Sequence, residues 1–153
     1  MKIGIVCSSG GHLTEALLMF DAFRDHDVFI CTYHSAMDPD VEALSPVYYF
    51  NNYFSQNQIK NIFYMVMMTL WSVSVILKTK PDAFISYGSE IALPYFYIGK
   101  IFKIKTIFIE PWCTIEHLSL TGRLVYSIAD EFIVQWPELV DKYPKAKYFG
   151  GIV

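Results

Sequence analysis

The sequence predicts an α/β protein in which helices cover both faces of a mostly parallel sheet. Short apolar runs rich in β-branched and aromatic residues alternate along the chain with longer segments of helical periodicity. The apolar runs are hydrophobic at consecutive positions rather than at every second one, which is typical of strands buried on both faces. Strands and helices that alternate in this way favour a Rossmann-like, doubly wound arrangement.

The first half of the chain contains three predicted strands and two predicted helices. The strands are expected at the apolar runs 3–6, 28–32 and 47–50. A helix from residue 13 to about residue 23 is predicted by apolar side chains at helical spacing, namely Leu13, Ala16, Leu17 and Phe20. A long helix is expected over residues 59–77. The segment 38–40 is expected to be a turn or the start of a helix, and 51–57 a surface loop.

The second half continues the same alternation. Strands are expected at 83–86, 106–109 and 131–134, with a last extended piece at 148–149. Helices are expected at 91–102 and 121–128, followed by a short helix after Trp136-Pro137. Because 153 residues are enough to bury one core, residues 1–153 are expected to form a single domain.

The composition limits the classes of partner. Hydrophobic residues make up 54% of the chain and charged residues only 18%, so some apolar surface is expected to face a membrane or another protein. The net charge of −3, without a stripe of Lys and Arg, argues against nucleic-acid binding. Three widely spaced cysteines lack metal-ligand spacing, so reduced thiols and no metal site are expected.

The long apolar helix is the strongest candidate for contact with a membrane. Its uninterrupted apolar part, residues 62–77, would be roughly 24 Å long, short of the roughly 30 Å hydrocarbon core. A single crossing would also separate strands that should share one sheet. We therefore expect this helix to lie in the membrane interface or against a partner, with Met65, Met68 and Trp71 in contact with lipid. Burial in the protein core is the alternative.

The stretch around Ser9, Gly10, Gly11 and His12 joins the first strand to the first helix. Glycines let the backbone approach a ligand closely, and the N–H groups of a helix N-terminus attract anions. An imidazole at the mouth of such a turn can exchange a proton near neutral pH. The turn is therefore a candidate anion site with an acid or base beside it, although an ordinary strand-to-helix turn would also use glycine here.

Two further turns are expected on the same edge of the sheet, because the carboxyl ends of parallel strands lie together. They contain Gly88-Ser89 and Glu110. The chain lacks both the G-x-G-x-x-G fingerprint and a P-loop, so a phosphate or diphosphate held by backbone N–H groups fits better than a dinucleotide, and no cofactor is expected. Simpler roles remain open: Ser89 as a helix cap, Glu110 as a loop cap and Arg123 as a surface residue.

The combination of motifs resembles a known family. The segments that carry the resemblance are 8–13 (SSGGHL), 87–89 (YGS) with Pro94, Glu110, 120–124 (LTGRL) and 129–130 (AD). They are similar to the membrane-anchoring subunit of the two-subunit N-acetylglucosaminyltransferase of the dolichol pathway, and still more to its bacterial relatives from capsule and exopolysaccharide clusters. The Gly-Gly-His turn also resembles that of the transferase that makes lipid II.

This resemblance implies a function as well as a fold. The chain would be the N-terminal, acceptor-side half of a GT-B glycosyltransferase, working with a separate catalytic subunit that binds the nucleotide sugar. The acceptor would be a polyprenyl-diphosphate-linked sugar at the cytoplasmic face of the membrane. Eukaryotic members carry a membrane-spanning N-terminus that is not seen here, so anchoring would fall to residues 59–77 or to the partner.

The resemblance also implies roles for particular residues. Gly10 and Gly11 would hold the acceptor diphosphate, and His12 would take the proton of the acceptor hydroxyl with Glu110 beside it. The remaining candidates for acceptor or phosphate binding are Ser9, Gly88, Ser89 and Arg123. Two alternatives stay open: a stand-alone enzyme that binds a nucleotide sugar, and a recruitment protein without catalytic function.

Overall fold

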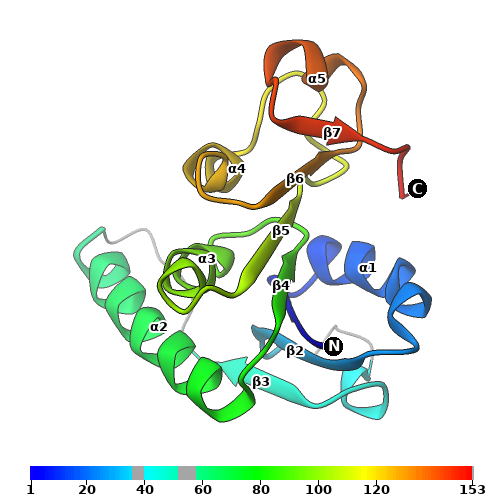
Figure 1. The fold of residues 1–153 in the computed structure, drawn as a ribbon. Coiled ribbons are helices and arrows are strands. Elements are labelled where there is room, and N and C mark those ends of the chain that lie inside the picture. Colours follow the sequence, from blue (N-terminus) through cyan, green and yellow to red (C-terminus); the bar gives the residue numbers. More distant parts are fainter. Residues whose placement is uncertain (36–39, 52–57, 153) are drawn as a thin grey trace.

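Seven strands form one parallel sheet in the computed structural model, which describes residues 1–35, 40–51 and 58–152 (Figure 1). The order across the sheet is β3-β2-β1-β4-β5-β6-β7, and every neighbouring pair is parallel. The strands are β1 (Lys2–Val6), β2 (Asp27–Tyr33), β3 (Val47–Phe50), β4 (Ala83–Ser86), β5 (Lys105–Ile109), β6 (Glu131–Val134) and β7 (Ala146–Tyr148). The predicted parallel α/β sheet is therefore confirmed.

The helices cover the two faces of the sheet unequally. One face carries α1 (Gly11–Leu18), whereas α2 (Gln58–Thr79), α3 (Ala92–Ile101) and α4 (Leu120–Val125) lie on the other (Figure 1). The short α5 (Glu138–Lys142) packs beside β7. The chain therefore leaves β1 toward one face and β4 toward the other. Because β1 and β4 are neighbours, the strand order reverses between them, and a crevice at this point is the usual ligand site of a doubly wound sheet.

Several element ends differ from the prediction. The first helix stops at Leu18, and a separate 3-10 helix follows over Phe20–Phe23. Three residues per turn bring Phe20 and Phe23 onto one side, where both pack against the core beneath α1. The last strand ends at Tyr148, earlier than expected, and most of the turn and loop predicted at 38–40 and 51–57 lies outside the described residues.

The side of α2 that faces the protein is not the side expected. Met68 is fully buried, and Met65 and Trp71 are half-buried. Met68 is therefore wrong as a lipid contact, and the other two are poor ones. The outward side instead carries exposed large apolar side chains, namely Ile62, Phe63, Val66, Met67, Leu70 and Leu77.

The buried side of α2 holds small hydroxyl residues, which explains the error. Ser72 is fully buried, and its Oγ donates to the carbonyl oxygen of Thr69 at 2.8 Å. The Thr69 Oγ1 likewise donates to the carbonyl oxygen of Met65 at 2.8 Å. Because the helix backbone satisfies these hydroxyls, they can face the core at little cost. A helix that is apolar on nearly all sides does not reveal by its sequence alone which side the core covers.

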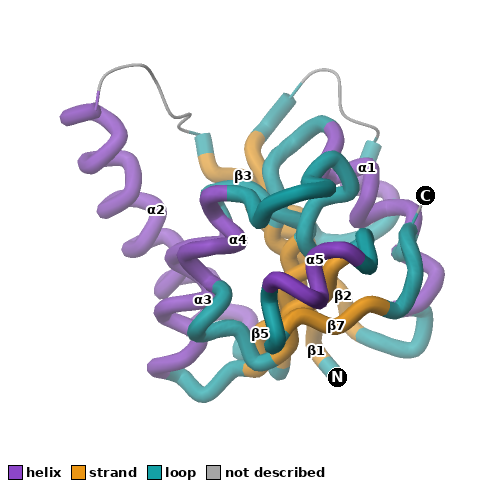
Figure 2. Tube along the Cα trace, turned by 90° about the horizontal axis from the view of Figure 1, so that it is seen from above, coloured by secondary structure: helices purple, strands orange, loops and turns teal. Residues whose placement is uncertain are grey.

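By length and composition, residues 60–79 of α2 could cross a membrane, and only 28% of that window is buried. However, α2 connects β3 to β4, and both strands belong to the same sheet. Figure 2 shows α2 running alongside the protein, with its first turns extending past the sheet on the side where the strands end. In this fold α2 therefore lies along the molecule rather than across a bilayer.

Replacing Met68 by Ala should lower the free energy of unfolding by about 2–5 kcal/mol, because the substitution leaves a cavity in the core. The neighbouring Met67, which is 39% exposed, provides the matched control. Its replacement by Ala should cost less than about 1 kcal/mol. Chemical denaturation of both variants measures the difference, and equal losses would contradict the orientation of α2 described above.

Candidate functional site

The turn after β1 presents an open helix N-terminus. Gly10 has a φ of +84°, and a Cβ built on Gly10 or Gly11 would meet no atom of the other described residues within 4 Å, chain neighbours aside. Gly10 occupies the N-cap position of α1 and has no side chain to cap it, and the half-buried Ser9 precedes it. The N–H groups of the first turn of α1 can therefore be reached by an anion.

The turn after β4 packs directly against the first turn of α1. Gly88 has a φ of +102°, and a Cβ there would lie 2.5 Å from Cγ of Pro111 and 2.8 Å from Cε1 of His12. Only glycine therefore fits between the β5 loop and the imidazole. The His12 Nδ1 is buried, and no hydrogen-bond partner for it occurs among the described residues. The structure thus brings Gly10, Gly11, His12 and Gly88 together at the point where the strand order reverses.

Glu110 lies beneath the start of α4. Its side chain is fully buried, and its Oε1 accepts a hydrogen bond from the backbone N–H of Ser119 at 2.6 Å. The Oε2 has no hydrogen-bond partner in the described chain and would lie 2.1 Å from a Cβ on Gly122. Burial raises the pKa of Glu110, while hydrogen bonds from Ser119 and Thr114 and the charge of Arg123 oppose that rise. No hydrogen bond joins this carboxylate to His12 within the described part of the chain.

Arg123 lies on the surface, as in its simpler expected role, whereas Ser89 does not take the simpler role expected for it. Arg123 is exposed on α4, and its Nε donates to the carbonyl oxygen of Leu118 at 3.0 Å. Ser89 has a positive φ of 78°, and its hydroxyl donates to the Oε2 of Glu90 at 2.9 Å. Because the N-cap of α3 is Ile91, the alternative role of Ser89 as a helix cap is wrong.

Further polar residues make contacts at this edge that were not anticipated from the sequence. Glu90 also accepts a hydrogen bond from the hydroxyl of Tyr33, at the end of β2, at 2.9 Å. Gln135, directly after β6, donates through Nε2 to Glu15 of α1 at 2.8 Å and to the carbonyl oxygen of Glu110 at 3.1 Å. A usable signal existed for Glu90 and Gln135, because each lies just beyond a predicted strand end.

The β5 and β6 loops are tied together by an aromatic pair. The Nε1 of Trp136 donates to the carbonyl oxygen of Trp112 at 2.7 Å, and the two ring centroids lie 6.1 Å apart. The backbone N–H of Trp112 donates to the carboxylate of Glu15 at 3.2 Å. These contacts hold the β5 loop against α1 and leave Trp112 44% exposed.

Two surface pockets lie away from the glycine turns. One of about 560 Å³ lies between the starts of β5 and β6, on the opposite edge, where Lys100 pairs with Asp130 and Lys147 pairs with Glu131 at 2.6 Å. Another, of about 770 Å³, lies beside β7 and α5. Among the described residues, no group of three or more His, Cys, Asp and Glu side chains could hold a metal ion. The glycine turns therefore remain the best candidate site.

Comparison with solved structures supports the fold. MurG from Acinetobacter baumannii superposes with a TM-score of 0.72 at 16% identity, covering 90% of this chain and 43% of that one. UDP-N-acetylglucosamine 2-epimerase from Rickettsia bellii gives 0.71 at 15% identity, covering 99% and 45%. The chain spans less than half the length of these proteins, and at such identities the likeness concerns the fold alone.

Comparison of sequences places the chain in a family. The profile described as "Oligosaccharide biosynthesis protein Alg14 like" matches residues 51–152. The "UDP-N-acetylglucosamine transferase subunit ALG14" of Homo sapiens is 27% identical, covering 100% of this chain and 83% of the relative. The Schizosaccharomyces pombe subunit of the same name is 26% identical, covering 93% and 79%. The chain therefore belongs to the Alg14-like family of oligosaccharide biosynthesis proteins.

Proposed function

We propose that this chain is the acceptor-binding, membrane-associating subunit of a two-component glycosyltransferase. The complex would add a sugar from a nucleotide sugar to a polyprenyl-diphosphate-linked glycan. The observation that carries the proposal is the uncapped N-terminus of α1, which lies beside the His12 ring where the loops after β1 and β4 meet. Sequence resemblance favours capsule or exopolysaccharide synthesis at the cytoplasmic face of the cell membrane as its setting.

The nucleotide-sugar site is assigned to a partner. Relatives that match along the whole chain are named as transferase subunits, and the matched solved structures are more than twice as long as this chain. Residues 1–153 would then be the acceptor-side half of a GT-B enzyme, with the crevice edge facing the donor half. A stand-alone nucleotide-sugar enzyme fits less well, because a GT-B enzyme needs two such domains facing a cleft and residues 1–153 supply one, whereas the matched structures are more than twice as long.

In this mechanism the backbone binds and the imidazole moves a proton. The N–H groups at Gly10 and Gly11 would hold the acceptor diphosphate at the positive end of α1. His12 would take the proton of the acceptor hydroxyl as its oxygen attacks the anomeric carbon and the nucleotide departs. Ser9 and Arg123 would add further phosphate contacts, whereas Ser89 is buried and its hydroxyl is bonded to Glu90, so it would contribute through its backbone.

Glu110 would act through the protein rather than on the acceptor. Its carboxylate is fully buried and holds the start of α4 through Ser119, so an acceptor at the open turn does not reach it. Its backbone carbonyl is bonded to Gln135, and Pro111 packs against the Gly88 turn. Glu110 is thus a positioning residue that fixes the β5 loop beside His12.

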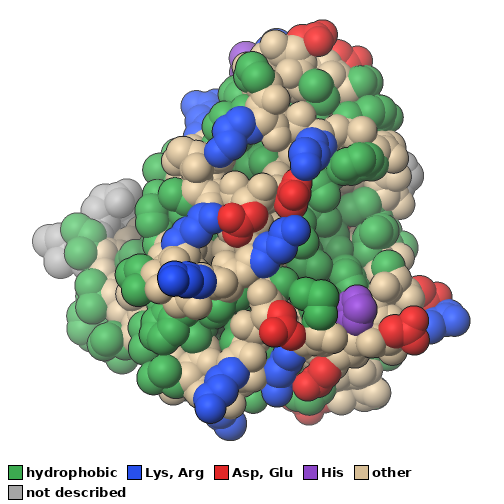
Figure 3. All heavy atoms as spheres, viewed as in Figure 1, with side chains coloured by type: hydrophobic (Ala, Val, Ile, Leu, Met, Phe, Trp, Pro, Cys, Tyr) green, Lys and Arg blue, Asp and Glu red, His purple; other side chains and the backbone are tan. Residues whose placement is uncertain are grey.

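The membrane contact would be the outward side of α2. Figure 3 shows hydrophobic side chains gathered along α2 at the left of that view, with Lys and Arg side chains nearer the middle of the face. Lys60 lies near the start of α2, and Lys78 and Lys80 lie at its end, all of them exposed. An apolar helix side bounded by lysines is suited to the boundary between acyl chains and anionic headgroups.

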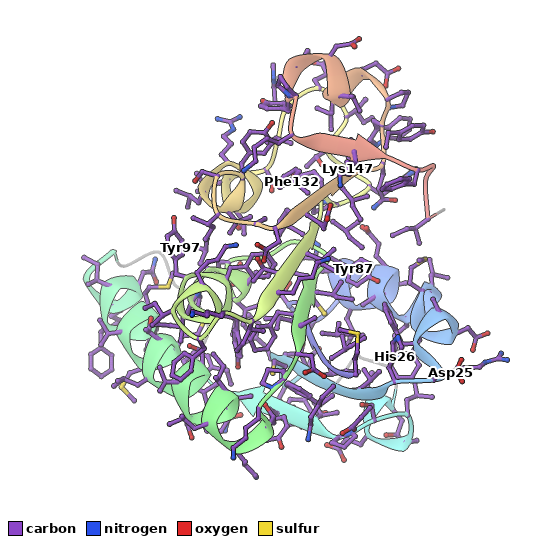
Figure 4. The ribbon with its side chains drawn as sticks, viewed as in Figure 1. Asp25, His26, Tyr87, Tyr97, Phe132 and Lys147 are labelled. Carbon is purple, nitrogen blue, oxygen red and sulfur yellow. The ribbon has the colours of Figure 1, made fainter. Side chains whose placement is uncertain are left out.

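His12→Ala should lower turnover of the complex by roughly 10²–10⁴-fold with little change in melting temperature, because a general base is lost. The assay needs the catalytic partner, a nucleotide sugar and a polyprenyl-diphosphate-linked acceptor. His26→Ala is the matched control, since His26 is exposed before β2, at the opposite edge of the sheet (Figure 4). Full activity of His12→Ala would remove this residue from the mechanism.

Glu110→Gln should change how stability depends on pH. Burial raises the pKa of Glu110 above its ordinary value of 4.5, so the folded chain holds this proton more tightly than the unfolded chain does. The contribution of Glu110 to stability should therefore decrease as pH rises from 4.5 through the raised pKa. Denaturation at several pH values measures the difference between wild type and Glu110→Gln.

The free energy of unfolding of the wild type, relative to that of Glu110→Gln, should decrease steadily as pH rises across this window. The same comparison with Glu116→Gln should show no such trend. Glu116 is an exposed carboxyl in the same loop and serves as the control. A difference that moved in favour of the wild type as pH rises would show that hydrogen bonding, rather than burial, dominates at Glu110.

Replacing Ile62, Phe63 and Leu70 together by Ser should reduce binding to anionic phospholipid vesicles by roughly 10–100-fold, because exposed apolar area is lost. Leu18→Ser on α1 is the control, since Leu18 is 57% exposed on the other face. Vesicle sedimentation measures binding, and the melting temperature should stay unchanged. Undiminished binding of the triple variant would exclude α2 as the membrane contact.

A further inference from the structure

An apolar groove runs between α2, α3 and α4, close to the crevice but separate from it. Its volume is about 300 Å³, and its lining includes Met65, Thr69, Leu93, Pro94, Tyr97 and Leu124. Figure 4 shows Tyr97 in the space between these three helices. The groove is at the small end of ligand pockets, which hold roughly 300–1,000 Å³. It can therefore take a few branched carbons but not a nucleotide sugar.

The chemistry of the lining selects an apolar occupant. Only two of the named lining side chains carry a hydroxyl, and both hydroxyls already donate within the protein. Thr69 donates to the carbonyl oxygen of Met65 at 2.8 Å, and Tyr97 donates to the carbonyl oxygen of Leu124 at 3.0 Å. A ligand group that accepts hydrogen bonds, such as a phosphate, would therefore lose its water here without finding a free hydroxyl donor, so hydrocarbon is favoured.

The α3 wall of the groove follows the Gly88 turn closely in the chain. Its α3 wall begins at Leu93, whose N–H donates to the carbonyl oxygen of Glu90 at 3.1 Å, directly after the Gly88 turn. Its α4 wall is formed by Leu124, the residue after the exposed Arg123. A molecule with a diphosphate at the crevice can therefore place its tail along this groove.

The groove is also continuous with the exposed side of α2. Met65 lines the groove and is followed at once by the outward-facing Val66 and Met67. Leu124 exposes apolar surface on the α4 side, at 44%. A hydrocarbon chain could therefore pass from an apolar medium outside α2 into the groove without crossing a polar surface.

We propose that this groove binds the first isoprenoid units of the lipid-linked acceptor and so directs its diphosphate toward the Gly10-Gly11 turn. This proposal rests on the proposed function and adds a second contact to it. The occupant is a branched hydrocarbon chain attached to an anionic head. The groove would make affinity depend on the length of the chain next to the diphosphate, as well as on the head itself.

The test measures binding of soluble probes to the full chain by calorimetry. The probes are inorganic diphosphate, dimethylallyl diphosphate, geranyl diphosphate and farnesyl diphosphate, with farnesol as a probe that lacks the head. Affinity should rise on the order of tenfold for each added isoprenoid unit until the groove is filled. Leu124→Trp, which fills the groove from its α4 wall, should abolish this gain while leaving the affinity for inorganic diphosphate unchanged.

Leu120→Trp is the matched control, because Leu120 lies one turn earlier on the same helix and points into solvent. It should keep the dependence on chain length. Met65→Trp fills the same groove from α2 and replaces Leu124→Trp should that variant not fold. The proposal would be overturned if affinity still increased with chain length in both Leu124→Trp and Met65→Trp. It would also be overturned if Leu120→Trp lost this increase to the same extent.

The same probes separate this inference from the proposed function. Gly11→Val places a side chain where phosphate must approach, in space that is otherwise open, and should remove binding of inorganic diphosphate. One outcome is that Gly11→Val loses diphosphate binding while an isoprenoid chain adds no affinity in the wild type. That result overturns the groove proposal and leaves the proposed function unchanged. Farnesol binding that Leu124→Trp abolishes, without any binding of diphosphate, supports the groove and overturns the function.

Discussion

The packing of the loops after β1, β4 and β5 depends on the absence of a side chain at residue 88. The Gly88 backbone lies where a Cβ would approach Pro111 and His12 to 2.5 and 2.8 Å, and its positive φ also suits glycine. This close approach lets the loops after β1, β4 and β5 meet at one point. Without it, the His12 ring would lose one wall of its site. The candidate site is therefore a product of tight loop packing rather than a preformed cavity.

A second constraint is that the polar edge, where the strands end, and the apolar flank, which is the outward side of α2, are separate parts of the surface. A water-facing surface helix buries its large apolar side chains and exposes its polar ones. Much of α2 does the reverse: Ser72 is fully buried, whereas Phe63 and Leu70 are about 60% exposed. Such a helix is stable where its outer surroundings are themselves apolar. The proposed acceptor, with an anionic head and a hydrocarbon tail, has the same division.

The sequence was sufficient for the sheet because its strands are buried on both faces and so appear as unbroken apolar runs. It also indicated the Gly10-Gly11 turn and Gly88, since glycines after such runs mark close backbone approach. It could not indicate the burial of Glu110, which depends on α4 folding back so that Ser119 caps the carboxylate. The orientation of α2 escaped prediction for a related reason, because its apolar residues surround the whole helix and only packing against α3 decides which of them are covered.

Among the described residues, chain neighbours aside, no atom lies within 4 Å of a Cβ built on Gly10 or Gly11, so in the proposed function the chain would need a second protein over this turn. Transfer of a sugar requires that water be kept from the activated donor, whereas the Gly10-Gly11 turn lies open. A second protein that covers this edge would supply both the donor and the exclusion of water. Gln135 connects such an event to the site, because its Oε1 accepts the N–H of Ile152 at 3.0 Å while its Nε2 bonds Glu15 and the carbonyl oxygen of Glu110. A partner that orders the chain near Ile152 would thereby also steady the β5 loop beside His12.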